Sequence, residues 1–369
     1  MQTRTRNALA VLALGAALGG GTALWYRARS PAPTEPIAPA SALGAIPGDA
    51  LLVGSADLRA LRASPVGAPF FRQGREIRGV GKIRDVCGFD PVDTLDEIAI
   101  TVPATGDGGD LGLAAAGAIQ ADAIVTCARR VIEARGGRPI VTPVGSFSTV
   151  RDTGAPSGSE IAVRPGGPVL LGGASTLRAM IDAADGRTPS VQTNDAHARI
   201  ARQAGGRAAR LTLVLTADLR RQIADELALA GAPAAPAASI LSAGLGIDLG
   251  PQVALHAVIA CAAAPACAAL GDRLRAARDE RVEDVGARLT GIAAILQRIE
   301  LTPEGEALHL RLTLPAADVA ALVERLLELR ERSEPPPSEP PPPEPPPAAL
   351  PPAALPPAAL PPPEPPPAE

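Results

Sequence analysis

Alternation of apolar and polar residues is clearest near the C-terminal end of the chain, where it predicts a strand followed by a helix. Four leucines share one side of the expected strand and smaller or polar residues share the other: Leu308, Leu310, Leu312 and Leu314 against Ala307, His309, Arg311 and Thr313. Because successive side chains of a strand point to opposite faces, one face should pack and the other should be solvated. In residues 316–332 the apolar positions recur every three or four residues, which is typical of an amphipathic helix. Its apolar stripe, which we expect to be packed, consists of Val319, Leu322, Val323, Leu326 and Leu327.

A short motif occurs twice and indicates an internal repeat. Residues 52–59 read LVGSADLR and residues 213–220 read LVLTADLR, so six of the eight positions are identical. In both copies a short apolar strand runs into an aspartate, Asp57 or Asp218, whose carboxylate can cap the N-terminus of a helix. The recurrence predicts two copies of one structural unit.

Later elements follow the motif in the same order in both copies. That order is a strand, a helix, a hairpin with Pro-x-Gly between two apolar runs, and a second helix. In the first copy these elements are expected at 111–119, 122–135, 161–171 and 175–184. In the second copy they are expected at 253–260, 265–278, 299–310 and 316–332.

These patterns predict an α+β fold made of two tandem related units. We place the first unit at 43–205 and the second at 206–333. Each unit is expected to be a largely antiparallel sheet covered by helices. The fold class also includes an N-terminal transmembrane helix and a disordered proline-rich tail, which are described next.

Residues 1–29 are expected to form a membrane anchor. The segment from Ala8 to Tyr26 is an apolar run with arginines on both sides, and at about 1.5 Å per residue it would nearly cross the hydrocarbon core of a bilayer. Trp25 and Tyr26 fall at the depth where interfacial aromatic residues belong. The alternative is a signal peptide that is cleaved at small residues near Ala23.

The anchor makes the lipid bilayer a predicted partner of the chain, through Ala8 to Tyr26. It predicts a single-pass protein of the inner membrane whose folded part lies outside the cytoplasm; cleavage near Ala23 would instead give a secreted or periplasmic protein. Residues 30–42 are rich in proline and alanine and should form a semi-stiff linker.

Residues 334–369 form a tail that is too rich in proline and too repetitive to fold into a core. Leucines recur in it every five residues, at Leu350, Leu355 and Leu360. The tail is therefore either a docking segment for an envelope protein partner or unselected low-complexity sequence.

Charge and aromatic content argue against nucleic acid as a partner. The chain has 35 basic and 39 acidic residues, a net charge of −4, and we find no basic run. Nucleic-acid binding needs a positive field. The only tryptophan and the only tyrosine belong to the anchor, so the folded part lacks the usual stacking platforms for bases or sugars.

Four cysteines in an exported chain suggest disulfides, with three possible pairings. Proximity favours Cys261 with Cys267, which leaves Cys87 with Cys127. By the chain-entropy model these bonds would contribute about 2.4 and about 3.9 kcal/mol, respectively. Alternatively, Cys127 is simply a buried thiol on a helix. The spacing of cysteines and histidines disfavours zinc.

No catalytic, cofactor-binding or metal-binding residue is predicted, and no cofactor is expected. Ser175 lacks the small flanking residues of a nucleophile elbow and is expected to cap a helix. A cluster of four carboxylates does not have the spacing of a calcium loop and is expected to be a solvated loop: Asp90, Asp93, Asp96 and Glu97. The three histidines have no base or nucleophile beside them in the sequence: His197, His256 and His309.

Three segments resemble a family of uncharacterised exported or membrane-anchored bacterial proteins with repeated α+β units, a domain of unknown function. The segments read IPGDALLVGSADLRALRASP, CGFDPVDTLDEIAI and LLGGASTLRAMID, and the resemblance extends over roughly residues 46–332. It implies the fold and an exported location, and it carries over no activity, cofactor or catalytic residue.

The expected function is that of a non-enzymatic, membrane-anchored protein of the cell envelope that acts as a binding or scaffolding module. One alternative is a carrier that holds a small apolar ligand in a cleft between the repeats. Another is a hydrolase whose catalytic residues come from distant parts of the chain.

Overall fold

A computed structural model describes residues 41–70, 85–88, 94–104, 111–155, 158–229, 238–289 and 291–333. The predicted anchor, nearly all of the predicted linker and the proline-rich tail lie outside the described residues. The chain divides into two units, 1–324 and 325–369, and the strands described below belong to the first. Within the described residues, no helix combines the length and the apolar character that crossing a membrane requires.

In its described residues, the first part of the chain contains seven strands and the helices that pack on them. The elements are η1 (Ala42–Ala45), β1 (Ala50–Asp57), α2 (Leu58–Ala63), β2 (Leu95–Pro103), β3 (Gly112–Gly117), α4 (Ala121–Ala134), β4 (Pro139–Val144), β5 (Phe147–Asp152), β6 (Glu160–Val163), β7 (Val169–Gly172), α5 (Ala174–Ala184), η2 (Val191–Thr193) and α6 (Asp195–Ala204).

The part of the structure described from residue 209 onward contains five strands and their helices. The elements are β8 (Ala209–Val214), α7 (Ala217–Leu229), β9 (Ile240–Leu249), β10 (Gln252–Cys261), α9 (Ala264–Glu283), α10 (Val285–Leu289), α11 (Ile292–Leu296), β11 (Glu300–Glu304), β12 (Ala307–Pro315) and α12 (Ala316–Ser333). All four later elements expected in each copy are present within a few residues of their expected bounds, except that α9 extends five residues beyond residue 278 and β12 five residues beyond residue 310.

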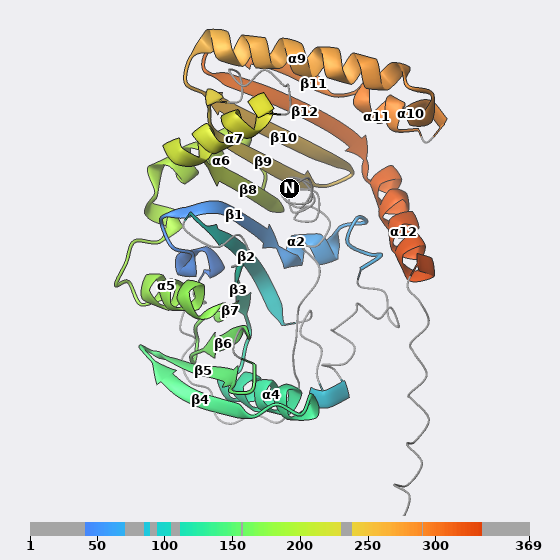
Figure 1. Cartoon of the computed structure of the whole chain (residues 1–369). Coiled ribbons are helices and arrows are strands. Elements are labelled where there is room, and N and C mark those ends of the chain that lie inside the picture. Colours follow the sequence, from blue (N-terminus) through green and yellow to red (C-terminus); the bar gives the residue numbers. More distant parts are fainter. Residues whose placement is uncertain are drawn as a thin grey trace, which may run out of the picture. The chain divides into compact units, whose positions relative to one another are not determined.

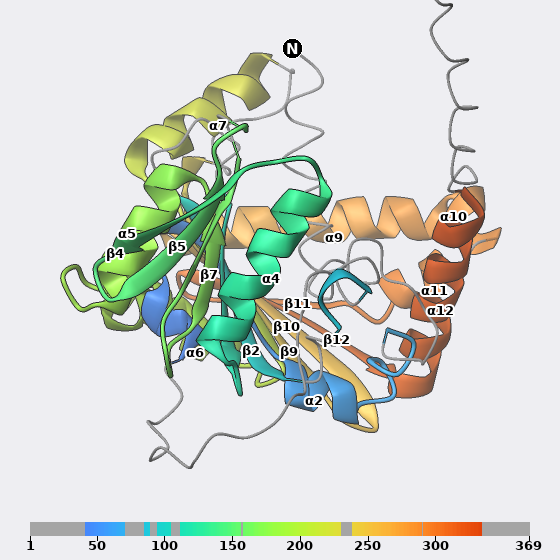
Figure 2. The same ribbon diagram turned by 90° about the horizontal axis from the view of Figure 1, so that it is seen from below.

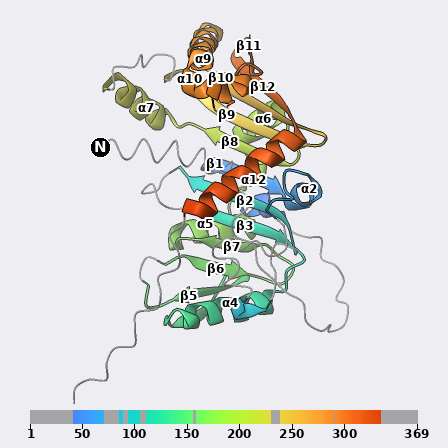
Figure 3. The ribbon, with the colours of Figure 1, turned by 90° about the vertical axis from the view of Figure 1, so that its right-hand side faces the viewer.

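The strands form one sheet in the order β11-β12-β10-β9-β8-β1-β2-β3-β7-β6-β5-β4, which can be followed in Figure 1 and, down to β5, in Figure 3. The neighbouring pairs are antiparallel. The protein therefore has a mixed α+β fold with a large antiparallel sheet. This sheet is continuous across both predicted repeats, because β1 pairs directly with β8.

The sheet runs outward from the β1–β8 pair in two series. On one side the strands follow as β1, β2, β3, β7 and β6, and on the other as β8, β9, β10, β12 and β11. The hairpin of β5 and β4 extends the first series. At the centre, Leu52 lies opposite Leu213 and Gly54 lies opposite Leu211.

Helices cover both faces of the sheet, so the fold has three layers. On one face α5 packs through Leu177 and Met180 against Ala162 and Leu170, and on the opposite face α4 packs through Ile124 against Val163. Figure 2 shows α5 and α4 on either side of β5 and β7. The same arrangement holds around β10, where α6 and α9 cover opposite faces.

Helix α6 connects the two series of strands. Its residues Ile200 and Ala204 pack against Val258 of β10, although α6 falls within the first predicted repeat. The loop after α6 lies directly against β9: Gly206 has a φ of 78°, and a Cβ at this position would lie 2.4 Å from the backbone nitrogen of Ile247. Only glycine fits this approach without displacing the backbone.

The two copies of the repeated motif begin their helices differently. The carboxylate of Asp57 accepts a hydrogen bond from the backbone N–H of Ala60 at 2.9 Å, so it caps α2 as predicted. In the second copy, the hydroxyl of Thr216 accepts from the N–H of Leu219, and Asp218 lies in the first turn of α7, where it pairs with Arg221. The prediction of Asp218 as the cap was wrong by two residues.

The apolar stripe of α12 is less buried than the sequence predicted. Leu322 and Leu326 are 44% and 56% exposed. Val319, Val323 and Leu327 are half-buried. On β12 the alternation is as predicted, with Leu308 fully buried and Arg311 and Thr313 exposed on the other face.

Candidate functional site

Two disulfides join helices to neighbouring parts of the fold. Cys87 is bonded to Cys127 of α4, and Cys261 at the end of β10 is bonded to Cys267 in the first turns of α9. These are the two pairs expected from the sequence, and they use all four cysteines of the chain. Formed disulfides indicate an oxidising location outside the cytoplasm.

His197 lies at the junction between the two series of strands. It belongs to α6, whose N-terminus is capped by Asn194, and it is 3% exposed. Its Nε2 is 2.9 Å from the backbone oxygen of Ala50, and its Nδ1 is 2.8 Å from the hydroxyl of Thr212. A carbonyl can only accept, so Nε2 carries the proton of the neutral ring and Nδ1 accepts from Thr212. The ring thus joins β1 to β8.

Burial lowers the pKa of His197 below its ordinary value of 6.5, and the hydrogen bond with the backbone of Ala50 opposes this shift only in part. The environment therefore favours the neutral ring. Both ring nitrogens are occupied by hydrogen bonds, so His197 serves to hold the junction together.

His256 and His309 form a contact that their sequence separation conceals. They lie on the neighbouring strands β10 and β12, with His256 Nε2 3.2 Å from His309 Nδ1 and the rings stacked with centroids 5.4 Å apart. His309 Nε2 is also 3.8 Å from a carboxylate oxygen of Glu304. One nitrogen of the close pair must donate and the other must accept, so the pair holds at least one neutral ring.

Burial and the nearby charges of Arg311 and His309 lower the pKa of His256. A hydrogen bond with the backbone of Ala204 and the charge of Glu304 act in the opposite direction. The neutral form of His256 is therefore favoured.

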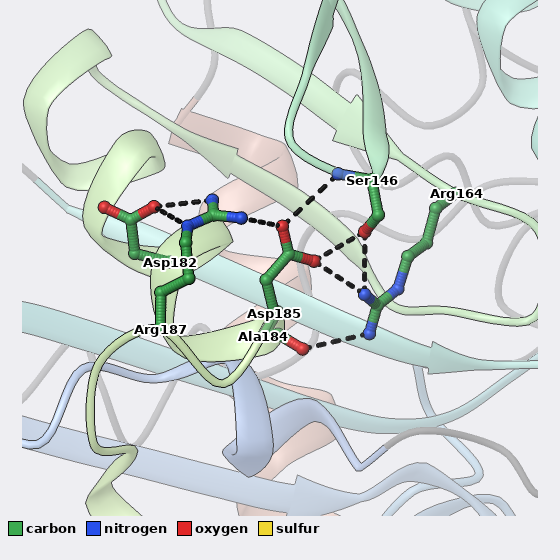
Figure 4. Close-up of polar contacts among 6 residues, drawn as sticks. All are labelled: Ser146, Arg164, Asp182, Ala184, Asp185 and Arg187. Atoms are coloured by element: carbon green, nitrogen blue, oxygen red, sulfur yellow. Dashed lines mark hydrogen bonds and ion pairs between the residues drawn. The ribbon is translucent and has the colours of Figure 1, made fainter.

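A polar cluster fastens the outer hairpin of the first series to α5 (Figure 4). The hydroxyl of Ser146, in the turn between β4 and β5, donates to Asp185 at 2.5 Å. Arg164, which follows β6, donates to the same carboxylate at 2.8 Å and to the backbone oxygen of Ala184 at 3.1 Å. Arg187 donates to Asp185 from the other side at 2.5 Å.

Asp185 is the centre of this cluster, with a side chain only 8% exposed. Burial by itself would raise the pKa of Asp185, but hydrogen bonds from Ser146 and Arg187 and the charge of Arg187 outweigh it, so the pKa lies below the ordinary value of 3.8. Asp185 is therefore ionised and fully engaged. The sequence carried no local signal for this cluster, because its members come from three separate turns.

The two described residues of the predicted carboxylate cluster, Asp96 and Glu97, contact different partners. Asp96 lies 3.4 Å from Arg59 and 3.6 Å from Arg62, whereas Glu97 accepts from the backbone N–H of Ala42 at 2.9 Å. Both residues belong to β2, so the expectation of a solvated loop was wrong for them. Asp90 and Asp93 lie outside the described residues.

Ser175 does not cap its helix, contrary to expectation. Gly173 is the N-cap of α5, and Ser175 lies in the first turn. Among the described residues, no group of three or more histidine, cysteine, aspartate or glutamate side chains has the arrangement of a metal site. In the polar clusters described above, the side chains form hydrogen bonds and ion pairs with one another or with the backbone.

No protein-family model matches this chain, and neither does any curated protein. Among solved structures, the chain is similar to one titled "Structure of crystal form I of TP0453". The two share 10% sequence identity with a TM-score of 0.41, over 78% of this chain and 98% of that chain.

Proposed function

We propose that the protein is a non-enzymatic, membrane-anchored scaffold of the cell envelope. In this proposal residues 8–26 hold the chain in the inner membrane, the linker spaces the sheet from the bilayer, and the folded part presents binding surfaces outside the cytoplasm. The single observation that carries the proposal is the pair of disulfides, Cys87–Cys127 and Cys261–Cys267, because they require an oxidising compartment.

We further infer that the sheet arose by duplication of one α+β unit. The two series of strands have the same order outward from the centre, and each begins with the repeated motif. The equivalent leucines of the motif, Leu52 and Leu213, lie opposite each other, as a local two-fold axis between the copies requires. The hairpin of β4 and β5 is an addition to the first copy.

The way in which the two copies are joined favours a rigid scaffold over a protein that opens a cleft between its repeats. The copies meet through a hydrogen-bonded strand pair, and the buried His197 ring bonds to both strands. Such a junction resists separation, which favours scaffolding over the alternative of a carrier that opens between the repeats.

The contacts of the histidines and of Asp185 likewise favour a structural role for them over a catalytic role in a hydrolase. His197 is engaged by Thr212 and Ala50, and His256 by His309 and the backbone of Ala204. Asp185 is engaged by two arginines and a serine. Among the described residues, these contacts do not place an acid, a base and a nucleophile in the hydrogen-bonded series that a hydrolase requires.

The location can be tested with the full chain expressed in a bacterium with an inner and an outer membrane. We expect the protein in the membrane fraction, resistant to extraction by alkali, and accessible to protease added to spheroplasts. We expect its cysteines to resist alkylation until a reductant is added. A cytoplasmic protein with reduced cysteines would overturn the proposal. N-terminal sequencing distinguishes the anchor from cleavage near Ala23, which keeps the compartment but removes the tether.

The two alternatives for the tail, a docking segment or unselected sequence, can be distinguished in the same cells. A photo-reactive amino acid is placed at Leu355, at the middle of the leucine repeat, and a matched control is placed at the neighbouring Pro356. Crosslinking to one envelope protein that depends on the leucine positions supports docking. Equal and diffuse crosslinking from both positions would show that the tail is not a specific docking segment.

A further inference from the structure

Three large apolar side chains project into solvent at the end of α9. Val285 is 68% exposed, Leu289 is 84% exposed and Ile292 is 50% exposed. They lie on the two short helices α10 and α11, which follow the C-terminal end of α9 (Figure 1). We call these three residues the apolar ridge.

The ridge faces outward because other apolar residues of α11 pack against the protein. Ala293 of α11 is 7% exposed and faces the protein, while Ile295 and Leu296 are half-buried. Gly291, with a φ of 77°, makes the turn between α10 and α11. Asp284 accepts from the backbone N–H of Ala287 at 2.9 Å and thereby fixes the start of α10. The segment is therefore an ordered turn of helix, apolar on both its inner and its outer side.

The segment that carries the ridge, residues 285–299, is itself basic. Residues 285–299 contain two arginines, Arg288 and Arg298, and no acidic residue. Both arginines are exposed. Exposed acidic residues border this segment on both sides, with Glu283 and Asp284 before it and Glu300 after it, and Asp284 also caps α10. Apolar side chains flanked by arginines are typical of segments that insert into the boundary between headgroups and acyl chains.

We propose that the apolar ridge inserts into the surface of the bilayer that holds the anchor. This inference rests on the proposed function, because the anchor supplies the membrane. A linker of the length of residues 30–42 reaches about 40 Å at most in an extended polyproline form. The folded part is then confined close to the lipid, and a weak apolar contact suffices to fix which face of the sheet it turns toward the membrane.

The chain offers a direct optical test, because Trp25 in the anchor is its only tryptophan. The full chain is placed in lipid nanodiscs of phosphatidylcholine and phosphatidylglycerol with brominated acyl chains, which quench tryptophan at membrane depth. The unmodified chain reports on the anchor through Trp25. The double variant Trp25→Phe/Leu289→Trp reports on the ridge, and Trp25→Phe/Leu111→Trp is the matched control, since Leu111 is an exposed apolar residue away from the ridge at 50% exposure.

We expect the tryptophan introduced at position 289 to emit at shorter wavelength and to lose intensity in brominated nanodiscs, while the one at position 111 keeps its intensity. The variant Trp25→Phe/Val285→Trp should behave like the first and guards against local misfolding at one site. Intact disulfides and an unchanged circular dichroism spectrum confirm that each variant is folded.

The possible results separate the two proposals. Quenching of Trp25 without quenching at positions 289 and 285 overturns ridge insertion and leaves the anchor in place. Quenching at the ridge without quenching of Trp25 supports the ridge and overturns the anchor. A shift to shorter wavelength that depends on protein concentration and is insensitive to bromine assigns the ridge to contact with a second copy of the chain, which also overturns the lipid proposal.

Discussion

A single buried ring, that of His197, ties together the strands at which the two series meet. Replacing it with alanine removes two hydrogen bonds and leaves a cavity beside the Ala50 carbonyl and the Thr212 hydroxyl. We expect His197→Ala to lower the free energy of unfolding by about 2–4 kcal/mol, measured by urea denaturation. Thr212→Val, which removes the bond to Nδ1 and the longer contact of the Thr212 hydroxyl with the backbone oxygen of Val53 at 3.4 Å, should cost about 1 kcal/mol. Equal midpoints for His197→Ala and the parent chain would contradict this role.

The lowered pKa of His197 predicts how stability depends on pH. Because the folded state binds the proton more weakly than the unfolded state, whose histidine titrates near 6.5, stability is complete above that pH and declines as the pH falls below it. The pKa of His256 is shifted in the same direction and adds to the decline. Between about pH 7.5 and about pH 5.5, His197→Ala should therefore lose less stability than the parent chain. An equal or larger loss in the variant would show that the ring is not the titrating group.

Asp185 is the residue on which the polar cluster of the outer hairpin depends. Asp185→Ala removes the acceptor of the Ser146 hydroxyl and the ion pairs with Arg164 and Arg187, although Arg164 keeps its bond to the backbone oxygen of Ala184. We expect a loss of about 1–3 kcal/mol in thermal or urea unfolding. Asp182 is a matched control, since it contacts Arg187 at the surface with a side chain 42% exposed. Asp182→Ala should cost less than about 1 kcal/mol. Similar losses in both variants would mean that burial of Asp185 contributes nothing.

The two disulfides close loops of very different length, with sequence separations of 40 and 6. The chain-entropy model assigns about 3.9 kcal/mol to the longer loop and about 2.4 kcal/mol to the shorter one. We expect Cys87→Ser/Cys127→Ser to lower the midpoint of thermal unfolding more than Cys261→Ser/Cys267→Ser does. The reverse order would indicate that the short bond acts by holding the first turns of α9 against β10 rather than through loop closure.

At the level of elements, strong periodicity was sufficient for prediction and weak periodicity was not. The leucine alternation identified β12, and the Pro-x-Gly turns identified the β6–β7 and β11–β12 hairpins. Strand β9 was missed because two glycines, Gly244 and Gly246, interrupt the apolar pattern of its sequence, ILSAGLGIDL. Strands β4 and β5 were missed as well. Pro139 and Pro143 argue against a strand in a central position, but β4 lies at the sheet edge, where no neighbour needs their missing N–H groups.

Side-chain clusters were the least predictable part of the candidate site. His256 and His309 are 53 residues apart, and their contact depends on the register of β10 and β12. The Ser146–Asp185 cluster depends on how a hairpin, a turn and a helix end are placed together. The cysteine pairs could be expected because proximity of Cys261 and Cys267 leaves only one further pairing. Local sequence determines elements, whereas such clusters are determined by the tertiary arrangement.

At the level of the whole sheet, the repeat was visible in the sequence but the way its copies join was not. The motif that marks each copy lies at the pair of β1 and β8, so the copies share their innermost strands as neighbours. The pattern of apolar and polar residues in either copy does not distinguish one continuous sheet, joined through β1 and β8, from two separate sheets that stack on each other. Both outer strands of the sheet, β4 and β11, contain proline, which limits the addition of further strands at the edges.

A continuous sheet predicts that residues 41–324 unfold in one step. Opening either series alone would expose β1 or β8 and break the bonds that hold α6 to the first series, from His197 to Ala50 and from Asn194 to Gly48. Calorimetry of the full chain in detergent should therefore show one transition. Asp185→Ala perturbs the outer part of the first series and Cys261→Ser/Cys267→Ser the outer part of the second, yet both should shift this same transition, while Asp182→Ala leaves it nearly unchanged. Two transitions, each shifted by only one of the variants, would show that the copies fold independently and that the β1–β8 pair couples them weakly.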